Sequence, residues 1–358
     1  MKPTRGILTI LFVCAYLSFA NCCHTFKNTE AEIKPQNEQV YTDKITGCIE
    51  RANDAFQGKT IEHVAVKQQM LPHIFRDSIR HLVKLKSIRF EKCEIESIHP
   101  YTFRNLPRVV EIAFTGNNIS EIKAETFARD MPVQILNLND NNIKSVENFQ
   151  NMPKLKRLLI KNNKISAITN NWFINSTSLQ EIDISHNKLE NLTANCFQYT
   201  KNLVKIDLSY NDISKLSKNT FDILKNIDFL NLRNNRISQI DGNAFVNNAV
   251  INHLNLGANK LNYLPTALMD NIKVKTFTIT GNPMRCNCIE SVTKWLERIE
   301  GVMVPLQGCT DSRLPYCVFP KILSLECEEN IDNESVQRYM GIIKGNKELL
   351  ACASDFFY

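Results

Sequence analysis

Apolar residues recur along the chain in a fixed order, with an asparagine at the same place in nearly every copy. The segment Leu179–Leu192 reads LQEIDISHNKLENL, and LVKIDLSYNDISKL follows 24 residues later. The shared skeleton is L-x-x-I-x-I-x-x-N-x-L, and ten copies are spaced 22 to 24 residues apart. They begin at Ile61, Leu85, Val109, Val133, Leu155, Leu179, Leu203, Ile227, Ile251 and Val274. Repetition at this period indicates a stack of similar structural units.

Positions four and six of every copy are apolar, and the residues between and beside them vary, so apolar residues alternate with others near the start of each copy. This pattern predicts a short strand with one buried face. A single unit could not bury that face alone, whereas neighbouring units in a stack bury one another. The sequence therefore predicts an α/β solenoid with a parallel β-sheet on its concave face and irregular or short helical convex segments. Strands are expected at 63–67, 87–91, 111–115, 135–139, 157–161, 181–185, 205–209, 229–233, 253–257 and 276–280.

Two columns of identical residues run through the repeats. The ninth position is Asn in eight copies, with Gln69 and Cys93 as the exceptions. A buried amide must be hydrogen-bonded, and we expect the backbone of the next repeat to be its partner. Phenylalanines expected to stack inside the convex half are Phe103, Phe127, Phe149, Phe173, Phe197, Phe221 and Phe245.

These repeats resemble the leucine-rich repeat family, in its typical 24-residue class of animal extracellular proteins. The resemblance implies an arc-shaped solenoid closed by caps. The segment Asn282–Cys309, NPMRCNCIESVTKWLERIEGVMVPLQGC, resembles the cysteine-rich C-terminal cap of that family. By that resemblance Cys286 pairs with Cys309 and Cys288 with Cys327. The common four-cysteine cap has no cysteine at the position of Cys317. One hypothesis is that Cys317 pairs with Cys352.

The N-terminal cysteines fit the family pattern less well. One of the adjacent residues Cys22 and Cys23 is expected to bond Cys48, which leaves the other as a candidate for an interchain bond. Cys93 and Cys196 are expected to be buried thiols. A disulfide-linked oligomer is therefore one hypothesis for the mature protein.

The first twenty residues carry the features of a secretory signal peptide. Lys2 and Arg5 precede the apolar run Ile7–Leu17, which is too short to span a membrane. The expected organisation is a signal at 1–20, an N-terminal cap at 21–60, repeats at 61–281, a C-terminal cap at 282–329 and a short helical tail at 330–358. The predicted mature protein is secreted, with no membrane span, into a compartment where disulfides form.

Neither charge nor motifs favour nucleic-acid binding or catalysis. Loss of Lys2 and Arg5 lowers the net charge from +6 to +4, which is mildly basic. The sequence holds no H-E-x-x-H, G-x-S-x-G, P-loop or G-x-G-x-x-G motif, and its seven histidines are scattered. We therefore expect no enzymatic activity, no metal and no cofactor, and a protein ligand or receptor as partner.

The concave strand positions offer the candidate binding residues. An aromatic ring at Phe229 would face solvent there, and aromatic and Arg side chains contribute most to interface energy. The candidate partner-binding residues are Phe229, Arg233, Tyr210, His253, Lys205 and Asp207. Candidate glycosylation sites, each in an N-x-S/T sequence, are Asn118, Asn175, Asn191 and Asn333.

The sequence predicts a secreted, protein-binding recognition module. Its resemblance to soluble immune proteins favours a role in innate immunity. Soluble leucine-rich immune proteins of insects are similar in their repeats but usually carry a long C-terminal coiled coil. The alternatives are an adhesion or guidance protein of the extracellular matrix and a secreted enzyme inhibitor.

Overall fold

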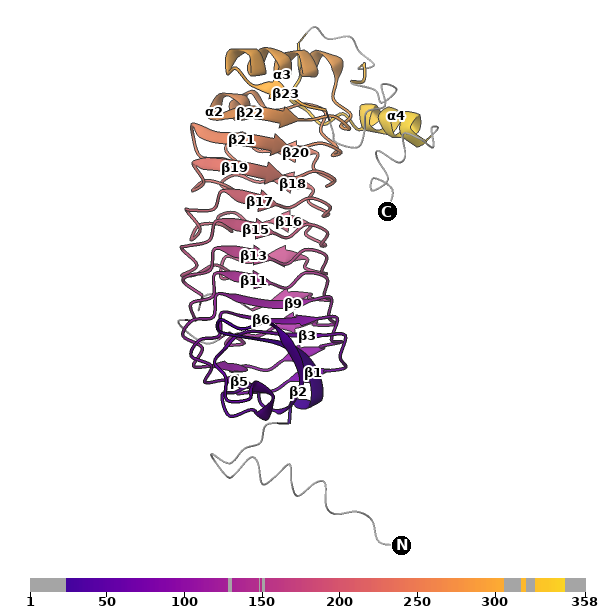
Figure 1. Ribbon diagram of the computed structural model, residues 1–358. Coiled ribbons are helices and arrows are strands. Elements are labelled where there is room, and N and C mark those ends of the chain that lie inside the picture. The colour runs from indigo at the N-terminus through magenta and orange to yellow at the C-terminus, as the bar shows by residue number, and fades with distance from the viewer. Residues whose placement is uncertain are drawn as a thin grey trace.

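Ten parallel strands stack into one side of a solenoid, in the order of the chain (Figure 1). The computed structural model describes residues 24–127, 131–147, 149, 152–305, 317–319 and 326–344. The ten strands are β3 (Ile61–Lys67), β6 (Ser87–Glu91), β9 (Glu111–Thr115), β11 (Ile135–Asn137), β13 (Arg157–Leu159), β15 (Glu181–Asp183), β17 (Lys205–Asp207), β19 (Asn226–Asn231), β21 (Ala249–Asn255) and β22 (Ile272–Thr278). Each overlaps the strand expected for its repeat, so the parallel sheet of the concave face is confirmed.

A second set of two-residue strands runs along the opposite side of the solenoid, and the sequence pattern did not predict it. These strands pair between neighbouring repeats as short parallel ladders. They are β4 (His73–Ile74) with β7 (Ser97–Ile98), β5 (Ile79–Arg80) with β8 (Phe103–Arg104), β10 (Glu121–Ile122) with β12 (Ser145–Val146), β14 (Ala167–Ile168) with β16 (Asn191–Leu192), and β18 (Lys215–Leu216) with β20 (Gln239–Ile240).

The phenylalanine column fills the convex half of the core, as predicted, but it is not continuous. Phe197 and Phe221 stack with ring centroids 5.6 Å apart, and the rings of Phe221 and Phe245 are 4.9 Å apart. Between Phe149 and Phe173 the indole of Trp172 makes edge contacts with both rings, at 5.8 and 6.0 Å. Trp172 is 1% exposed and belongs to the 24-residue repeat that follows the shortest one, 133–154, whose Phe149 it contacts.

The buried asparagines connect neighbouring repeats, and their main partner lies in the preceding repeat. Asn211 donates from Nδ2 to the carbonyl of Ile184 (3.0 Å), and its Oδ1 accepts the backbone N–H of Leu189 (3.0 Å). It also donates to Leu208 in its own turn (3.0 Å). The expectation that the next repeat supplies the partner was wrong. The groups that meet the amide of Asn211, the carbonyl of Ile184 and the N–H of Leu189, both belong to the repeat before it.

Cys93 takes the place of an asparagine in this ladder. Its Sγ donates to the carbonyl of Val66 (3.3 Å), which corresponds to the bond from Asn117 Nδ2 to the carbonyl of Phe90 (3.0 Å). Cys93 is fully buried and Cys196 is 1% exposed, and both are free thiols, as expected.

An antiparallel hairpin covers the N-terminal end of the sheet. Strand β1 (Phe26–Pro35) pairs with β2 (Tyr41–Gly47) and, on its other side, with β3. The short helix η1 (Asp54–Phe56) then leads into the first repeat. Thr29, Ala31 and Ile33 are buried at alternate positions of β1. This alternation was visible in the sequence, although no strand was predicted here.

Helices cover the C-terminal end. α2 (Thr266–Asn271) precedes the last long strand, and α3 (Cys286–Arg298) lies across the end of the stack (Figure 1). Trp295 of α3 is 3% exposed and meets Phe277 of β22 edge-on at 5.6 Å. Strand β23 (Val302–Met303) adds the last edge of the sheet. Trp295 and Leu296 thus lie on the buried side of a helix that closes the stack.

The cap disulfides differ from the expectation at one pair. Cys288 bonds Cys327, as the resemblance implied, whereas Cys286 bonds Cys317. The proposed pairs Cys286–Cys309 and Cys317–Cys352 are wrong. The reason is that Val318 runs beside residues 284–286, donating its N–H to Met284 O (2.7 Å) and accepting from Cys286 N (3.1 Å). This short ladder brings the Cα atoms of Cys286 and Cys317 to 4.9 Å.

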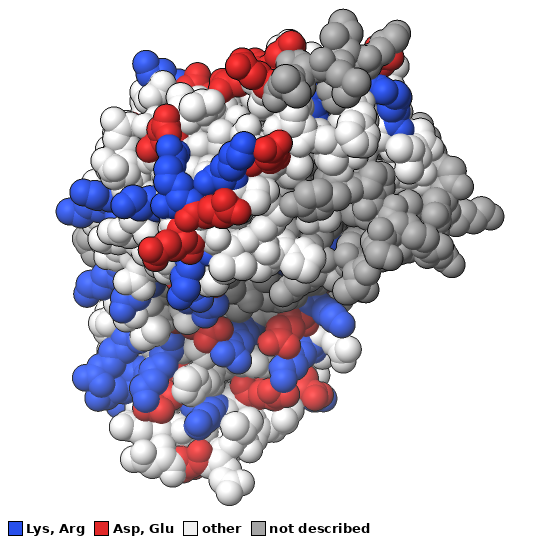
Figure 2. Space-filling model, turned by 90° about the horizontal axis from the view of Figure 1, so that it is seen from above, with Lys and Arg blue, Asp and Glu red and all other residues white. Residues whose placement is uncertain are grey.

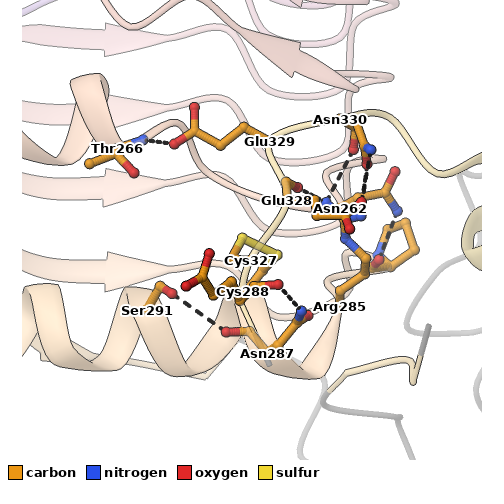
Figure 3. The surroundings of a disulfide bond; sticks show 12 residues. Asn262, Thr266, Arg285, Asn287, Cys288, Ser291, Cys327, Glu328, Glu329 and Asn330 are labelled. Carbon is orange, nitrogen blue, oxygen red and sulfur yellow. Dashed lines mark hydrogen bonds between the residues drawn. A yellow bond between two sulfur atoms is a disulfide. The ribbon is translucent and has the colours of Figure 1, made fainter. Parts of the chain in front are cut away.

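Arg285 ties the segment after Cys327 to the last repeat (Figure 3). Its side chain is 4% exposed, and it donates to Asn330 Oδ1 (2.8 Å) and to the carbonyl of Glu328. Asn262 donates to Pro283 O (2.9 Å) and accepts the N–H of Asp332 (2.9 Å). Helix α4 (Asn333–Lys344) follows directly, so the predicted tail helix begins where this network ends.

Some predictions concern residues outside the described ranges. These are the signal peptide and the cysteines Cys22, Cys23, Cys309 and Cys352. Cys48 is disulfide-bonded, and its partner is also outside the described ranges. Within α4, Tyr339 and Ile343 are buried against Val318 with Met340 beside them.

Candidate functional site

The concave strands bring four of the six predicted binding residues together. Lys205, Phe229 and His253 occupy the same position in adjacent strands, because Lys205 pairs in register with Phe229 and Phe229 with His253. Asp207 lies two residues further along its strand, at position five, where it is in register with Asp183 and Asn231. Parallel pairing without register slip therefore places these side chains on one surface.

A shallow hollow of about 380 Å³ opens at this place. Phe229 forms an apolar part of its wall. The ring lies on the face of the sheet that points away from the core, and it is only partly buried. His253 is exposed and its Nδ1 lies 2.7 Å from Thr276 Oγ1. The residues that line the hollow are Glu181, Ile182, Asp183, Lys205, Ile206, Asp207, Asp228, Phe229 and His253. This surface can receive a side chain or short segment of another molecule.

Two aspartates in the hollow are held in place by their own strands. Asp207 Oδ1 accepts the N–H of Ser209 (2.9 Å) and its hydroxyl (2.6 Å), while Oδ2 accepts from Asn231 Nδ2 (3.1 Å). Asp183 Oδ1 makes the same two bonds to Ser185, at 2.9 and 2.6 Å. The carboxylates therefore have fixed positions before any ligand arrives.

The outer edge of the hollow carries an ion pair. Arg157 donates to Glu181 through Nε (2.7 Å) and Nη2 (3.2 Å). The hydrogen bond with Glu181 raises the pKa of Arg157. Glu181 is thus neutralised within the protein. Within the described ranges, Lys205, Asp183, Asp207 and Asp228 form no ion pair.

The other two predicted residues, Tyr210 and Arg233, form a separate stack at the end of the strands. The rings of His186 and Tyr210 are parallel, with centroids 4.2 Å apart, and the guanidinium of Arg233 lies 5.9 Å from the Tyr210 ring. Neither Tyr210 nor Arg233 lines the hollow.

The backbone at this stack is unusual. His186 and Tyr210 are at position eight of their repeats and have φ of 54° and 55°. All ten residues at position eight have positive φ, which suits Gly and Asn better than a bulky ring. The stacked rings offset part of that strain.

Sequence reasoning missed four residues of this region. Glu181, Asp183 and Asp228 line the hollow, and His186 stacks on Tyr210. Asp183 could have been found, because it shares position five with Asp207 in the neighbouring repeat. His186 shares position eight with Tyr210 in the same way. Asp228 precedes Phe229 and gave no periodic signal.

The four sequons all lie outside the sheet of the concave face. Asn118, Asn175, Asn191 and Asn333 are exposed. Asn118 follows ladder residue Asn117, and only its backbone N–H is engaged in the stack, by the carbonyl of Ile95 (2.8 Å). Glycans at these places would leave the hollow open.

Acidic and basic side chains are mixed on the C-terminal end of the molecule, as Figure 2 shows for the described part of that face. On α3 and beside it, Lys294 pairs with Glu290 (2.7 Å) and Arg298 with Asp270 (2.9 Å). Neither sign of charge therefore dominates the described part of this end.

Two features are missing from the part of the chain that the structure describes. No group of three or more His, Cys, Asp or Glu side chains there is arranged to hold a metal ion. In the same residues, every helix is too short or too polar to cross a bilayer.

Family models support the repeat assignment. The Leucine rich repeat model matches residues 132–189, 177–237 and 225–284. The BspA type Leucine rich repeat region model matches residues 46–156. Together these matches run from residue 46 to residue 284 of the 358. No curated protein is significantly similar in sequence.

Solved structures share the architecture at low sequence identity. One is a chain of the octameric complex of Latrophilin 3 (Lec, Olf), Unc5D (Ig, Ig2, TSP1) and FLRT2 (LRR). It is 18% identical, with a TM-score of 0.60, covering 76% of this chain and 85% of that one. Another match is the TLR13–ssRNA13 complex, with 16% identity and a TM-score of 0.46 over 72% of this chain and 52% of that one. Only the first of these two supports a shared fold, and at 18% identity its likeness concerns the fold alone.

Proposed function

Because the chain belongs to the leucine-rich repeat family, we propose that it is a secreted recognition protein that binds another protein through its concave face. The observation that carries the proposal is the hollow around Phe229. The partly exposed ring does not pack in the core of the protein. Its burial by a partner would contribute about 25 cal/mol of binding free energy for each Å² of apolar surface removed from water.

Three further features support an extracellular binding role. The disulfides Cys286–Cys317 and Cys288–Cys327 are typical of proteins that fold in an oxidising compartment. The sequons lie away from the sheet, so glycans and a protein ligand would occupy different surfaces. The leucine-rich repeat fold is typically a scaffold for protein interaction, and the proposal includes no enzymatic activity, cofactor or nucleic-acid ligand.

We infer innate immunity as the biological role, from the resemblance of the repeats and cap to soluble leucine-rich immune proteins. Adhesion or guidance is the second candidate. The fold shared with a chain of the Latrophilin 3, Unc5D and FLRT2 complex favours it. Induced expression on infection supports the first role, and patterned expression in neural or muscle tissue supports the second. Tight binding to a single hydrolase would instead identify an enzyme inhibitor.

The experiment is capture of the partner from extracellular fluid with the purified protein, identification by mass spectrometry, and measurement of its affinity. We expect Phe229→Ala to weaken binding by about 1 kcal/mol or more, because a central aromatic anchor is lost. Secretion and melting temperature should not change, since the ring is not part of the core.

The matched control is Lys188→Ala, which removes an exposed side chain beyond the strand. It should bind the partner as the wild type does. Equal affinity of the Phe229 variant and the wild type would show that the concave hollow is not the binding site.

A further inference from the structure

We propose that the hollow receives a cationic side chain, arginine or lysine, from an exposed segment of the partner protein. This inference rests on the proposed function, because it specifies the chemistry of the ligand at the same surface. The hollow supplies the space and the aromatic wall, and its charge selects the occupant.

The charge of the hollow is negative after internal pairing. Four carboxylates line it, at Glu181, Asp183, Asp207 and Asp228, against the single ammonium group of Lys205. Arg157 neutralises Glu181 through two hydrogen bonds. Three aspartates and one lysine remain, so an incoming cation is favoured and an anion is opposed.

The fold does not require two of these charges. At position five, a side-chain oxygen accepts the N–H two residues on, and Asn137, Asn231 and Asn255 make that bond as amides, at 3.0, 3.1 and 2.9 Å. An amide at positions 183 and 207 would keep the same bond to Ser185 or Ser209, although at 207 it would lose the bond from Asn231 Nδ2.

The two carboxylates also oppose each other. Asp183 and Asp207 are in register on adjacent parallel strands, one strand spacing or about 4.8 Å apart. Like charges in directly opposed positions destabilise a sheet. A cationic ligand between them would remove that repulsion.

Phe229 completes the fit for a long cationic side chain. The methylene stem of an arginine or lysine can cover the ring, and the ring face attracts the charged end. The mature chain itself carries a predicted net charge of +4, so a cationic peptide would be repelled by the protein as a whole and attracted only locally.

The test uses full-length secreted protein passed over biosensor surfaces that carry short synthetic peptides. One peptide contains two arginines separated by glycine, and matched peptides contain lysine, glutamine or glutamate at the same places. We expect the arginine and lysine peptides to bind, the glutamine and glutamate peptides not to bind, and the binding to weaken as salt is raised.

Variants with matched shape locate the interaction. Asp183→Asn with Asp207→Asn should weaken binding of the arginine peptide by about tenfold. The melting temperature should change little, because the relief of charge repulsion offsets the loss of the bond from Asn231 Nδ2 to residue 207. Lys205→Gln should strengthen it, an effect that general destabilisation cannot produce. Glu96→Gln with Glu190→Gln removes two exposed charges away from the sheet and should have no effect.

Several results would overturn the inference. These are no binding of the arginine peptide, equal binding of the glutamate peptide, or a double aspartate variant that binds as the wild type does. If the captured partner remains sensitive to Phe229→Ala while the arginine peptide fails, the proposed function stands and only the cationic ligand is wrong. If the partner is insensitive to both sets of variants, both proposals fail.

Discussion

In eight of the ten repeats, a single asparagine side chain satisfies backbone groups from two turns. Asn211 accepts the N–H of Leu189 and donates to the carbonyls of Ile184 and Leu208. The role of this residue could be predicted from the sequence, because a polar residue at one place in eight repeats has to be buried and paired. Whether the bonded backbone groups lie in the preceding or the next repeat could not be predicted, because both neighbours have the same sequence pattern.

We expect Asn211→Ala to lower the free energy of unfolding by about 1–3 kcal/mol, because it leaves buried backbone groups without partners. Lys188→Ala, at an exposed side chain, should change it by no more than about 0.5 kcal/mol. Denaturant titration of both variants measures the difference. Equal unfolding midpoints would contradict the ladder.

The buried thiols should be unreactive in the folded protein. Burial raises the pKa of Cys196 from 9.0 to about 12, and burial also raises the pKa of Cys93. Iodoacetamide at pH 8 should therefore alkylate neither residue until the protein is unfolded, as peptide mapping would show. As pH rises, the Cys196 thiol ionises in the unfolded chain before it does so in the folded protein. Its burial therefore contributes fully to the free energy of unfolding below about pH 9, and this contribution declines toward pH 12. Rapid labelling of the native protein would disprove the burial.

At the scale of elements, the periodic parts of the chain were predictable and the caps were less so. Each of the ten long strands overlaps its predicted range because a local alternation determines it. The pairing of Cys286 depends instead on where Val318 lies against Met284, which no local pattern encodes. The hairpin of β1 and β2 was missed because it is a single, unrepeated element.

The C-terminal cap should open before the repeats when its disulfides are reduced. Cys286 and Cys288 both anchor α3, and Trp295 on the same helix packs against the last repeat. Loss of a native disulfide typically costs about 2–5 kcal/mol. In a titration with reductant at constant temperature, tryptophan emission should shift to the red before the far-ultraviolet circular dichroism is lost.

The second tryptophan provides the control for that experiment. Trp172 lies in the middle of the stack, so a Trp172→Phe variant keeps only the cap signal. Simultaneous loss of emission and circular dichroism in that variant would mean that the cap and the repeats unfold as one unit.

At the scale of the whole molecule, the stack should tolerate removal of a complete repeat. Deleting residues 203–226 joins Asn202 to Ile227 and keeps the 24-residue period. We expect a secreted, cooperatively folded protein with a lower melting temperature, since repeats interact mainly with their neighbours. It should lose partner binding, because Asp207, one of the carboxylates that line the hollow, is removed.

Deletion of residues 203–214 alone is the contrasting variant. It removes half a period and places the next strand and asparagine out of line with their neighbours, so it should fail to fold. Secretion yield and circular dichroism distinguish the two. Similar behaviour of both deletions would contradict a modular stack.

The unequal ends of the sheet have a consequence for the behaviour of the protein at high concentration. A parallel sheet with bare edges is a template on which a second chain can add strands, and aggregation begins at such edges. Here the first repeat is covered by β1 running in the opposite direction, and the other end stops at a two-residue strand beneath α3. The outermost strand at the N-terminal end is β2, which pairs antiparallel with β1. Neither end therefore offers the parallel edge on which a second molecule could continue the stack of repeats. The chain should remain dispersed at high concentration, with its strand face free for a ligand.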